Sequence, residues 1–147
     1  MSSLSALVFK DSLATQQSSI QEINQIMLGT YVDWRWQVWR IISSVVHVTN
    51  RKDRNTHSSK QSFATGYLQV ESAISYEWML YARVEGITEK EHLDYLALFT
   101  HSVLERQLAG LRYDFFNKNA LTLEFARAEA AMQEFDQAML QWSAVFS

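Results

Sequence analysis

The sequence predicts an all-α protein, an elongated four-helix bundle with antiparallel neighbours and a short N-terminal helix. Three observations favour this fold class. The 147-residue chain contains no proline and only four glycines, so few residues interrupt a helix. Apolar residues recur at steps of three and four along most of the chain. The C-terminal segment has the alternating steps of a heptad pattern. We therefore expect one helical domain that covers residues 1–147.

The first long helix is predicted over residues 16–49, after a weakly ordered segment, 1–15, that contains the short helix. Its apolar stripe consists of Ile20, Ile23, Met27, Tyr31, Trp34, Val38, Ile41, Val45 and Val48. A second apolar row, which includes Trp36 and Trp39, lies beside that stripe. This helix therefore has more apolar surface than a single contact covers. Whether Gly29 breaks the helix stays open.

Three further helices are predicted over residues 62–85, 89–117 and 120–146. The polar stretch 49–62 indicates an exposed loop, Gly86 is placed to end a helix, and Thr88 and Glu91 match a capping box. The last helix carries the clearest pattern, with Leu121, Phe125, Ala128, Met132, Phe135, Met139, Trp142 and Phe146 at steps of four and three. Short connections favour antiparallel packing of these helices in a bundle.

The composition excludes several kinds of chemistry. With no cysteine, the chain has no thiol nucleophile, disulfide or cysteine-ligated metal. It also lacks the Gly-x-Ser-x-Gly motif of many hydrolases and any glycine-rich phosphate loop. Glu89 and His92 have the spacing of a di-iron ligand pair, but such a site needs two of these motifs. We therefore expect no cofactor and no metal, and catalysis is disfavoured.

Charge and hydropathy favour a cytoplasmic protein that does not contact a membrane. Residues 1–9 have no basic residue before their short apolar stretch, and the sequence has no run of about 18 apolar residues. The net charge is −3 and the pI is about 5.8. A mildly acidic chain is a poor general binder of nucleic acid, because phosphate binding depends on clustered positive charge.

The strongest candidate for a binding surface is the cluster of Trp36, Trp39, Arg35 and Arg40. Tryptophan and arginine are the residues most enriched at energetic hot spots of protein interfaces. The sequence therefore predicts a non-catalytic interaction protein, such as an adaptor, an inhibitor or immunity protein, or an accessory subunit. It would act as a homodimer through an exposed tryptophan-rich helix face. In the alternative interpretation this helix lies in the middle of the bundle and is surrounded.

A second candidate is the basic loop 51–60, which carries Arg51, Lys52, Arg54 and Lys60. It is either a solvated loop or a site for phosphate or nucleic acid. The spacing of Arg51 and His57 resembles the Arg-x(4–6)-His motif of the HEPN family, whose members are small all-α bundles and often dimeric ribonucleases. The resemblance implies a composite site in which the Arg51 guanidinium holds a phosphate and the His57 imidazole assists attack by the ribose hydroxyl.

Overall fold

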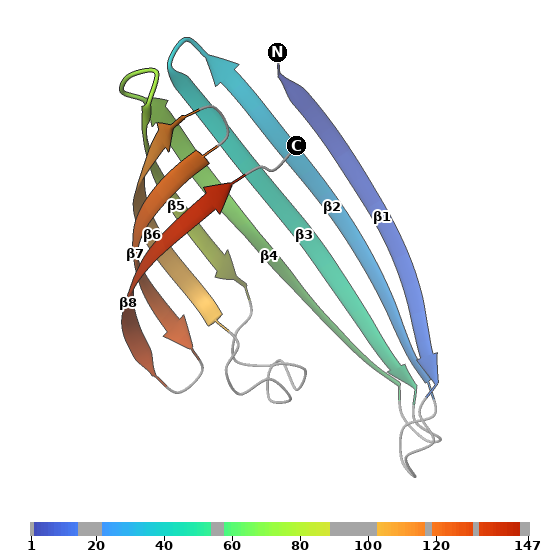
Figure 1. Ribbon diagram of the computed structural model, residues 1–147. Helices are drawn as coiled ribbons and strands as arrows, with labels where there is room; N and C mark the ends of the chain where they lie inside the picture. The colour runs from blue at the N-terminus through green and yellow to red at the C-terminus, as the bar shows by residue number, and fades with distance from the viewer. Residues whose placement is uncertain are drawn as a thin grey trace.

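A computed structural model describes residues 2–14, 22–53, 58–88, 103–116, 119–130 and 133–144. All regular secondary structure in these ranges is β-strand. The strands are β1 (Ser3–Ala14), β2 (Glu22–Trp36), β3 (Trp39–Asp53), β4 (Ser58–Ala73), β5 (Trp78–Ile87), β6 (Val103–Phe115), β7 (Asn119–Ala130) and β8 (Glu134–Ala144). They form one antiparallel sheet in which the spatial order follows the chain order (Figure 1).

The prediction of an all-α four-helix bundle is therefore wrong. β2 and most of β3 occupy the predicted helix 16–49, and β4 and β5 occupy most of the predicted helix 62–85. The described part of 89–117 is β6, and β7 and β8 lie within 120–146. Strand β1 takes the place of the short N-terminal helix. In the part of the chain that the structure describes, no helix is long and apolar enough to cross a membrane.

The misassignment has a physical origin in β2. The residues Ile26, Leu28, Val32, Trp34 and Trp36 alternate with other side chains along the strand. A spacing of two also contains pairs that are four apart, so the same residues fit a helical stripe. The β-branched and aromatic residues in this segment favour a strand over a helix.

Chain reversals also differ from those that the sequence predicts. β2 and β3 are joined by the two-residue turn Gln37–Val38, in which Gln37 adopts a φ of 53°. Common hairpin turns contain Asn-Gly or Asp-Gly, and this turn has neither. Gly29 does not interrupt β2, because it pairs with Leu7 and Val46 inside the sheet. In the predicted loop 49–62, residues 49–53 and 58–62 are strand, and residues 54–57 lie outside the described residues.

The pairing register divides the side chains of the sheet between two faces. Directly opposite residues share a face, so each strand contributes alternate residues to it. On one face, which we call the inner face, lie all the buried side chains of the central strands. They include Asp33, Ile42, Val48, Asn50, Phe63, Glu71, Leu108, Ala126 and Ala128. On the opposite face, the outer face, the described side chains are exposed or half-buried, and none is buried.

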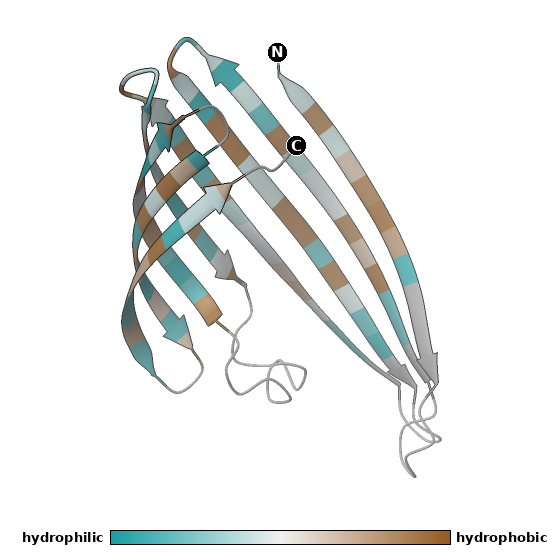
Figure 2. Cartoon of the chain, in the orientation of Figure 1, coloured by the Kyte–Doolittle hydropathy of each residue, from teal (hydrophilic) through white to brown (hydrophobic). Residues whose placement is uncertain are grey.

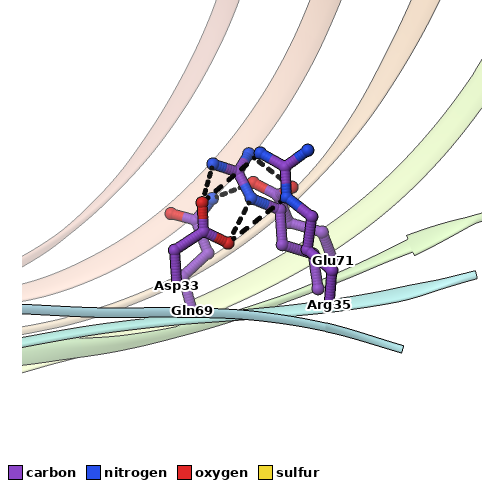
Figure 3. Close-up of polar contacts among 5 residues, drawn as sticks. Asp33, Arg35, Gln69 and Glu71 are labelled. Atoms are coloured by element: carbon purple, nitrogen blue, oxygen red, sulfur yellow. Dashed lines mark hydrogen bonds and ion pairs between the residues drawn. The ribbon is translucent and has the colours of Figure 1, made fainter. Parts of the chain in front are cut away.

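Curvature of the sheet accounts for this burial. The later strands bend around the side chains that rise from β2, β3 and β4 (Figures 1 and 3). A small apolar core of Val48 and Phe63, packed against Met27, Val46 and Ile87, lies on this inner face. The sheet therefore buries inner side chains of its central strands without a second layer, whereas Leu7 and Phe9 on the inner face of β1 stay exposed.

Candidate functional site on the two faces of the sheet

An apolar band crosses the outer face from β1 to β8. Figure 2 shows the hydrophobic and hydrophilic residues alternating along the strands. The band consists of Leu4, Ala6 and Val8 on β1, Ile26 to Trp36 at every second position on β2, Trp39 to Val45 on β3, Ala64 to Ser72 on β4, Trp78 to Gly86 on β5, Ala109 to Phe115 on β6, Leu121 to Phe125 on β7, and Ala138 to Ala144 on β8, with the same alternation throughout. None of these outer positions carries Lys, Arg, Asp or Glu.

Much of this band is exposed although its side chains are apolar. Leu68 is 45 % exposed, Leu80 49 %, Phe125 59 % and Leu140 67 %. Contiguous exposed apolar patches on monomeric water-soluble proteins rarely exceed a few hundred Å² and often mark an interaction site. A surface that runs over all the described strands is therefore the strongest candidate for an interaction surface.

All five tryptophans lie on the outer face at one end of the strands, which we call the tryptophan end. Trp36 and Trp39 flank the β2–β3 turn and pair with each other, Trp78 begins β5, and Trp34 and Trp142 lie two residues from a strand end. The Trp34 and Trp36 rings stack with centroids 6.2 Å apart. The rings of Trp78 and Tyr113 stack at 4.5 Å. This end of the band is thus a row of aromatic rings.

Among the residues whose side chains the structure describes, charged ones appear on the outer face only beyond the opposite end of the band, which we call the charged end. They are Lys10, Arg51, Lys60, Glu105, Arg127, Glu129, Glu134 and Asp136. Arg127 donates a hydrogen bond of 2.6 Å to Glu134, and this carboxylate raises the pKa of the Arg127 guanidinium. The outer face therefore changes along the strands from aromatic to aliphatic to charged.

The inner face carries a network of charged side chains centred on Asp33 (Figure 3). Arg40 donates two hydrogen bonds of 2.9 Å to the Asp33 carboxylate and one of 3.3 Å to Glu71. Arg35 donates a further pair of 3.3 and 3.4 Å to Asp33, and Gln69 donates to Glu71 at 2.6 Å. Because two guanidinium groups hold it, Asp33 stays charged although its side chain is only 12 % exposed.

A second network continues the polar inner face across β5, β6 and β7. The Tyr81 hydroxyl donates to Glu124 at 2.8 Å, and Arg106 donates to the same carboxylate at 3.2 Å. Arg83 donates to Glu85 at 2.7 Å, and its guanidinium lies 4.2 Å from the centre of the Tyr67 ring. Arginines and carboxylates thus neutralise each other over the middle of the inner face.

The structure separates the four residues of the predicted tryptophan–arginine surface. Trp36 and Trp39 are 56 % and 44 % exposed on the outer face. Arg35 and Arg40 lie on the inner face and hold Asp33. In a strand, neighbouring residues point to opposite faces, whereas in a helix they would have shared one surface. The two tryptophans and the two arginines therefore belong to different sites.

The described basic residues of the predicted loop 51–60 lie on strands. Arg51 and Lys60 are directly opposite each other on β3 and β4, at the charged end of the outer face. The side chain of Lys52, together with Arg54 and His57, lies outside the described residues. The ribonuclease alternative is wrong, because the HEPN family is helical and this chain forms a β-sheet.

Sequence reasoning missed the division of the side chains between the inner and outer faces of the sheet. Glu71 and Glu124 become neighbours of Arg40 and Arg106 only through pairing between strands, and pairing adds Arg40 to the Arg35 that Asp33 already contacts within β2. The signal that could have identified the faces is the alternation along β2 and β5. Among the described residues, no three His, Asp or Glu side chains form a metal site, and Glu89 and His92 lie outside these residues. No known protein family, curated protein or solved structure matches the chain.

Proposed function

We propose that the outer face lies in the hydrocarbon of a lipid bilayer and that the protein is a non-catalytic, membrane-embedded sheet with a hydrated inner face. The observation that carries this proposal is the inversion of the usual arrangement. Buried charged groups lie on the inner face, while the apolar band on the outer face carries no Lys, Arg, Asp or Glu. Exposing the apolar band to water is unfavourable, whereas a surface in contact with hydrocarbon has to be apolar.

The dimensions of the band support this environment. It covers residues 26–36 of β2, 64–72 of β4 and 78–86 of β5. A tilted strand crosses the hydrocarbon of a bilayer in about 9–11 residues, and these ranges have that length. On the other five strands the band is shorter, covering residues 4–8 of β1, 39–45 of β3, 109–115 of β6, 121–125 of β7 and 138–144 of β8. It is followed toward the charged end by Lys10, His47, Gln107, Arg127 and Asp136.

The order of residue types along the strands supports the same orientation. Aromatic rings concentrate where hydrocarbon meets the headgroups, because one side of the ring is apolar and its edge tolerates water. The tryptophan end has this composition. Charged side chains belong beyond the hydrocarbon, and the charged end supplies them on the same face. One boundary of the hydrocarbon layer would therefore lie at Trp36 and Trp39, and the other boundary would lie near Lys10 and Arg51.

The inner face is suited to contact with water. Its ion pairs are partly exposed, with 33 % of the Arg40 side chain and 28 % of the Arg106 side chain accessible. In hydrocarbon these groups would carry a high desolvation cost, but a hydrated concave side lets them pair and remain solvated. The two faces thus favour two different solvents.

This proposal keeps the expected absence of catalysis and replaces the expectation of a cytoplasmic protein without membrane contact. A protein partner on the tryptophan-rich surface is the competing occupant. Non-obligate protein interfaces are about as polar as the remaining surface and carry about one hydrogen bond per 100–200 Å². The apolar band offers only a few hydroxyl groups, such as those of Thr30, Ser43 and Ser72. Hydrocarbon therefore fits it better.

The test compares an arginine placed inside the band with one placed beyond it. Leu68 lies in the middle of the band on β4, and Ser62 lies on the same face and strand toward the charged end. If the band contacts hydrocarbon, Leu68→Arg destabilises the vesicle-inserted protein and Ser62→Arg does not. Equal effects of the two substitutions, or a stable folded state in water without lipid or detergent, would reject the proposal.

A further inference from the structure

The two outermost strands of the described sheet each have one edge without a neighbouring strand. β1 pairs only with β2, and β8 pairs only with β7. An edge strand presents a row of backbone N–H and C=O groups that can pair with another strand. The inference rests on the proposed function in one respect, because in hydrocarbon such groups cannot bond to water and each edge must be paired. A further strand must therefore pair with each of the two edges.

The edges of β1 and β8 are complementary in direction. The N-terminal end of β1 and the C-terminal end of β8 both lie at the tryptophan end of the sheet, as the chain ends in Figure 1 show. If β1 of one molecule lies beside β8 of another with the same face outward, the two strands run antiparallel. The alternation of strand direction then continues across the contact, and both tryptophan ends stay on the same side.

One register also makes the side chains complementary. When Leu4 is set opposite Trp142, Ala6 meets Leu140 and Val8 meets Ala138 on the outer face. Lys10 then faces Asp136. A shift of two residues in one direction places Val8 against Asp136, and in the other direction Lys10 against Ala138. A shift of one residue places outer side chains opposite inner ones. In the shift that places Val8 against Asp136, Lys10 faces Glu134, but an apolar side chain then lies opposite a carboxylate. Of these registers, only the first joins every apolar residue with an apolar one and charge with charge.

The charges at the two edges have opposite sign on the outer face. Among the described side chains of β1, Lys10 is the charged one. On β8, Glu134 and Asp136 both lie near Arg127 of β7, so two carboxylates face one guanidinium. A lysine placed opposite Asp136 compensates the remaining negative charge. Charge complementarity therefore supports this register as well as this pair of edges.

We infer that β1 of one copy pairs with β8 of a second copy of the chain, with Val8 opposite Ala138 and Lys10 opposite Asp136. Within one copy the described strands β2 to β7 separate these edges, and Figure 1 shows them at the two margins of the sheet. Each copy offers one edge of each kind. Two copies joined by two such contacts leave no described strand edge unpaired.

Cysteine cross-linking tests the contact, because the native chain contains no cysteine. Val8→Cys protein and Ala138→Cys protein are mixed in detergent, reconstituted together into lipid vesicles and oxidised. Opposed residues in an antiparallel pair have Cα atoms about 4.5–5.5 Å apart, which suits a disulfide. We expect a product of twice the chain mass that contains one copy of each variant.

The matched control replaces Val8→Cys with Ala6→Cys and keeps Ala138→Cys. This pair is diagonal, with Cα atoms about 7–8 Å apart, so its yield is expected to be at least about tenfold lower. A fast-migrating monomer from the double variant Val8→Cys/Ala138→Cys would show pairing within one chain and overturn the inference. Homodimers of the Val8→Cys protein alone, or equal yields from both pairs, would also overturn it.

A charge exchange provides a second measurement. Lys10→Glu should weaken the dimer several-fold, because it opposes a carboxylate to Asp136, and Lys10→Glu/Asp136→Lys should restore it. No weakening by Lys10→Glu, or no restoration in the double variant, would exclude the Lys10–Asp136 contact. Failure of these tests while Leu68→Arg still destabilises the inserted protein would overturn the edge contact and leave the bilayer proposal standing.

Discussion

Replacing Leu68 with arginine places a charge in the middle of the apolar band. Leu68 lies between Ser43 of β3 and Val84 of β5 on the outer face and is 45 % exposed, so the longer side chain needs no repacking of a core. On the lipid face of a membrane-embedded sheet, arginine at the bilayer midplane costs about 2–4 kcal/mol and near the interface about 0–1 kcal/mol. A loss of this size reduces the folding equilibrium constant by about 30- to 900-fold.

The control substitution is Ser62→Arg, six residues along the same strand and face. At about 3.3 Å per residue it lies about 20 Å from Leu68 along the strand, next to the charged end. Both variants are unfolded by guanidinium chloride from lipid vesicles and followed by tryptophan fluorescence and far-UV circular dichroism. We expect the folding equilibrium constant to fall at least about fivefold further for Leu68→Arg than for Ser62→Arg. If the two variants lose equal stability, as exposed positions in water would, the reasoning about the outer face is refuted.

Two further predictions concern the inner face. Asp33→Asn removes the charge that Arg35 and Arg40 share and should cost about 1–3 kcal/mol in denaturant unfolding, whereas Asp114→Asn, in the exposed pair with Arg112, should cost less than about 0.5 kcal/mol. Equal losses would contradict a stabilising Asp33 network. Gly110→Ala places a Cβ on the Tyr81 ring, which must then move away from Glu124, and should cost about 1–3 kcal/mol. Gly86→Ala, whose nearest neighbour atom is 3.7 Å away, is the control, and a stable Gly110→Ala protein in which Tyr81 keeps its bond to Glu124 would contradict the contact.

Two of the polar stretches in the sequence lie where one strand gives way to the next, although the elements predicted on either side of them were helices. β3 gives way to β4 inside the stretch 49–62, and β6 gives way to β7 near residues 116–119. Polar residues mark these reversals in either fold class, because a chain reversal exposes its backbone to solvent. Proline and glycine were uninformative here, since a two-residue turn at Gln37 and Val38 needed neither.

The prediction of the fold class failed because spacing alone does not distinguish a strand with apolar residues on both faces from a helix with a broad apolar stripe. In β2 the apolar residues on both faces, such as Met27 inside and Leu28 outside, fill helical positions together. The content of β-branched and aromatic residues from Ile23 to Val48 carried the better signal. Without pairing partners, that signal gives no register.

The candidate site depended on the register and was beyond sequence reasoning for that reason. Arg40 and Glu71 are 31 residues apart in the chain, and only the β3–β4 pairing brings them together. The sequence predicts a partner for the surface that contains Trp36 and Trp39, and this stays a prediction. Their separation from Arg35 and Arg40 follows from the alternation of side chains in a strand.

The central claim is that alternate residues of β2 face hydrocarbon and water, and a cysteine scan from residue 27 to 32 measures this directly. Single cysteines are introduced one at a time into the vesicle-inserted protein and exposed to a water-soluble thiol reagent. We expect rapid labelling at the inner positions 27, 29 and 31 and slow labelling at the outer positions 28, 30 and 32. Labelling that repeats every three to four residues, or faster labelling at the outer positions, would contradict the account.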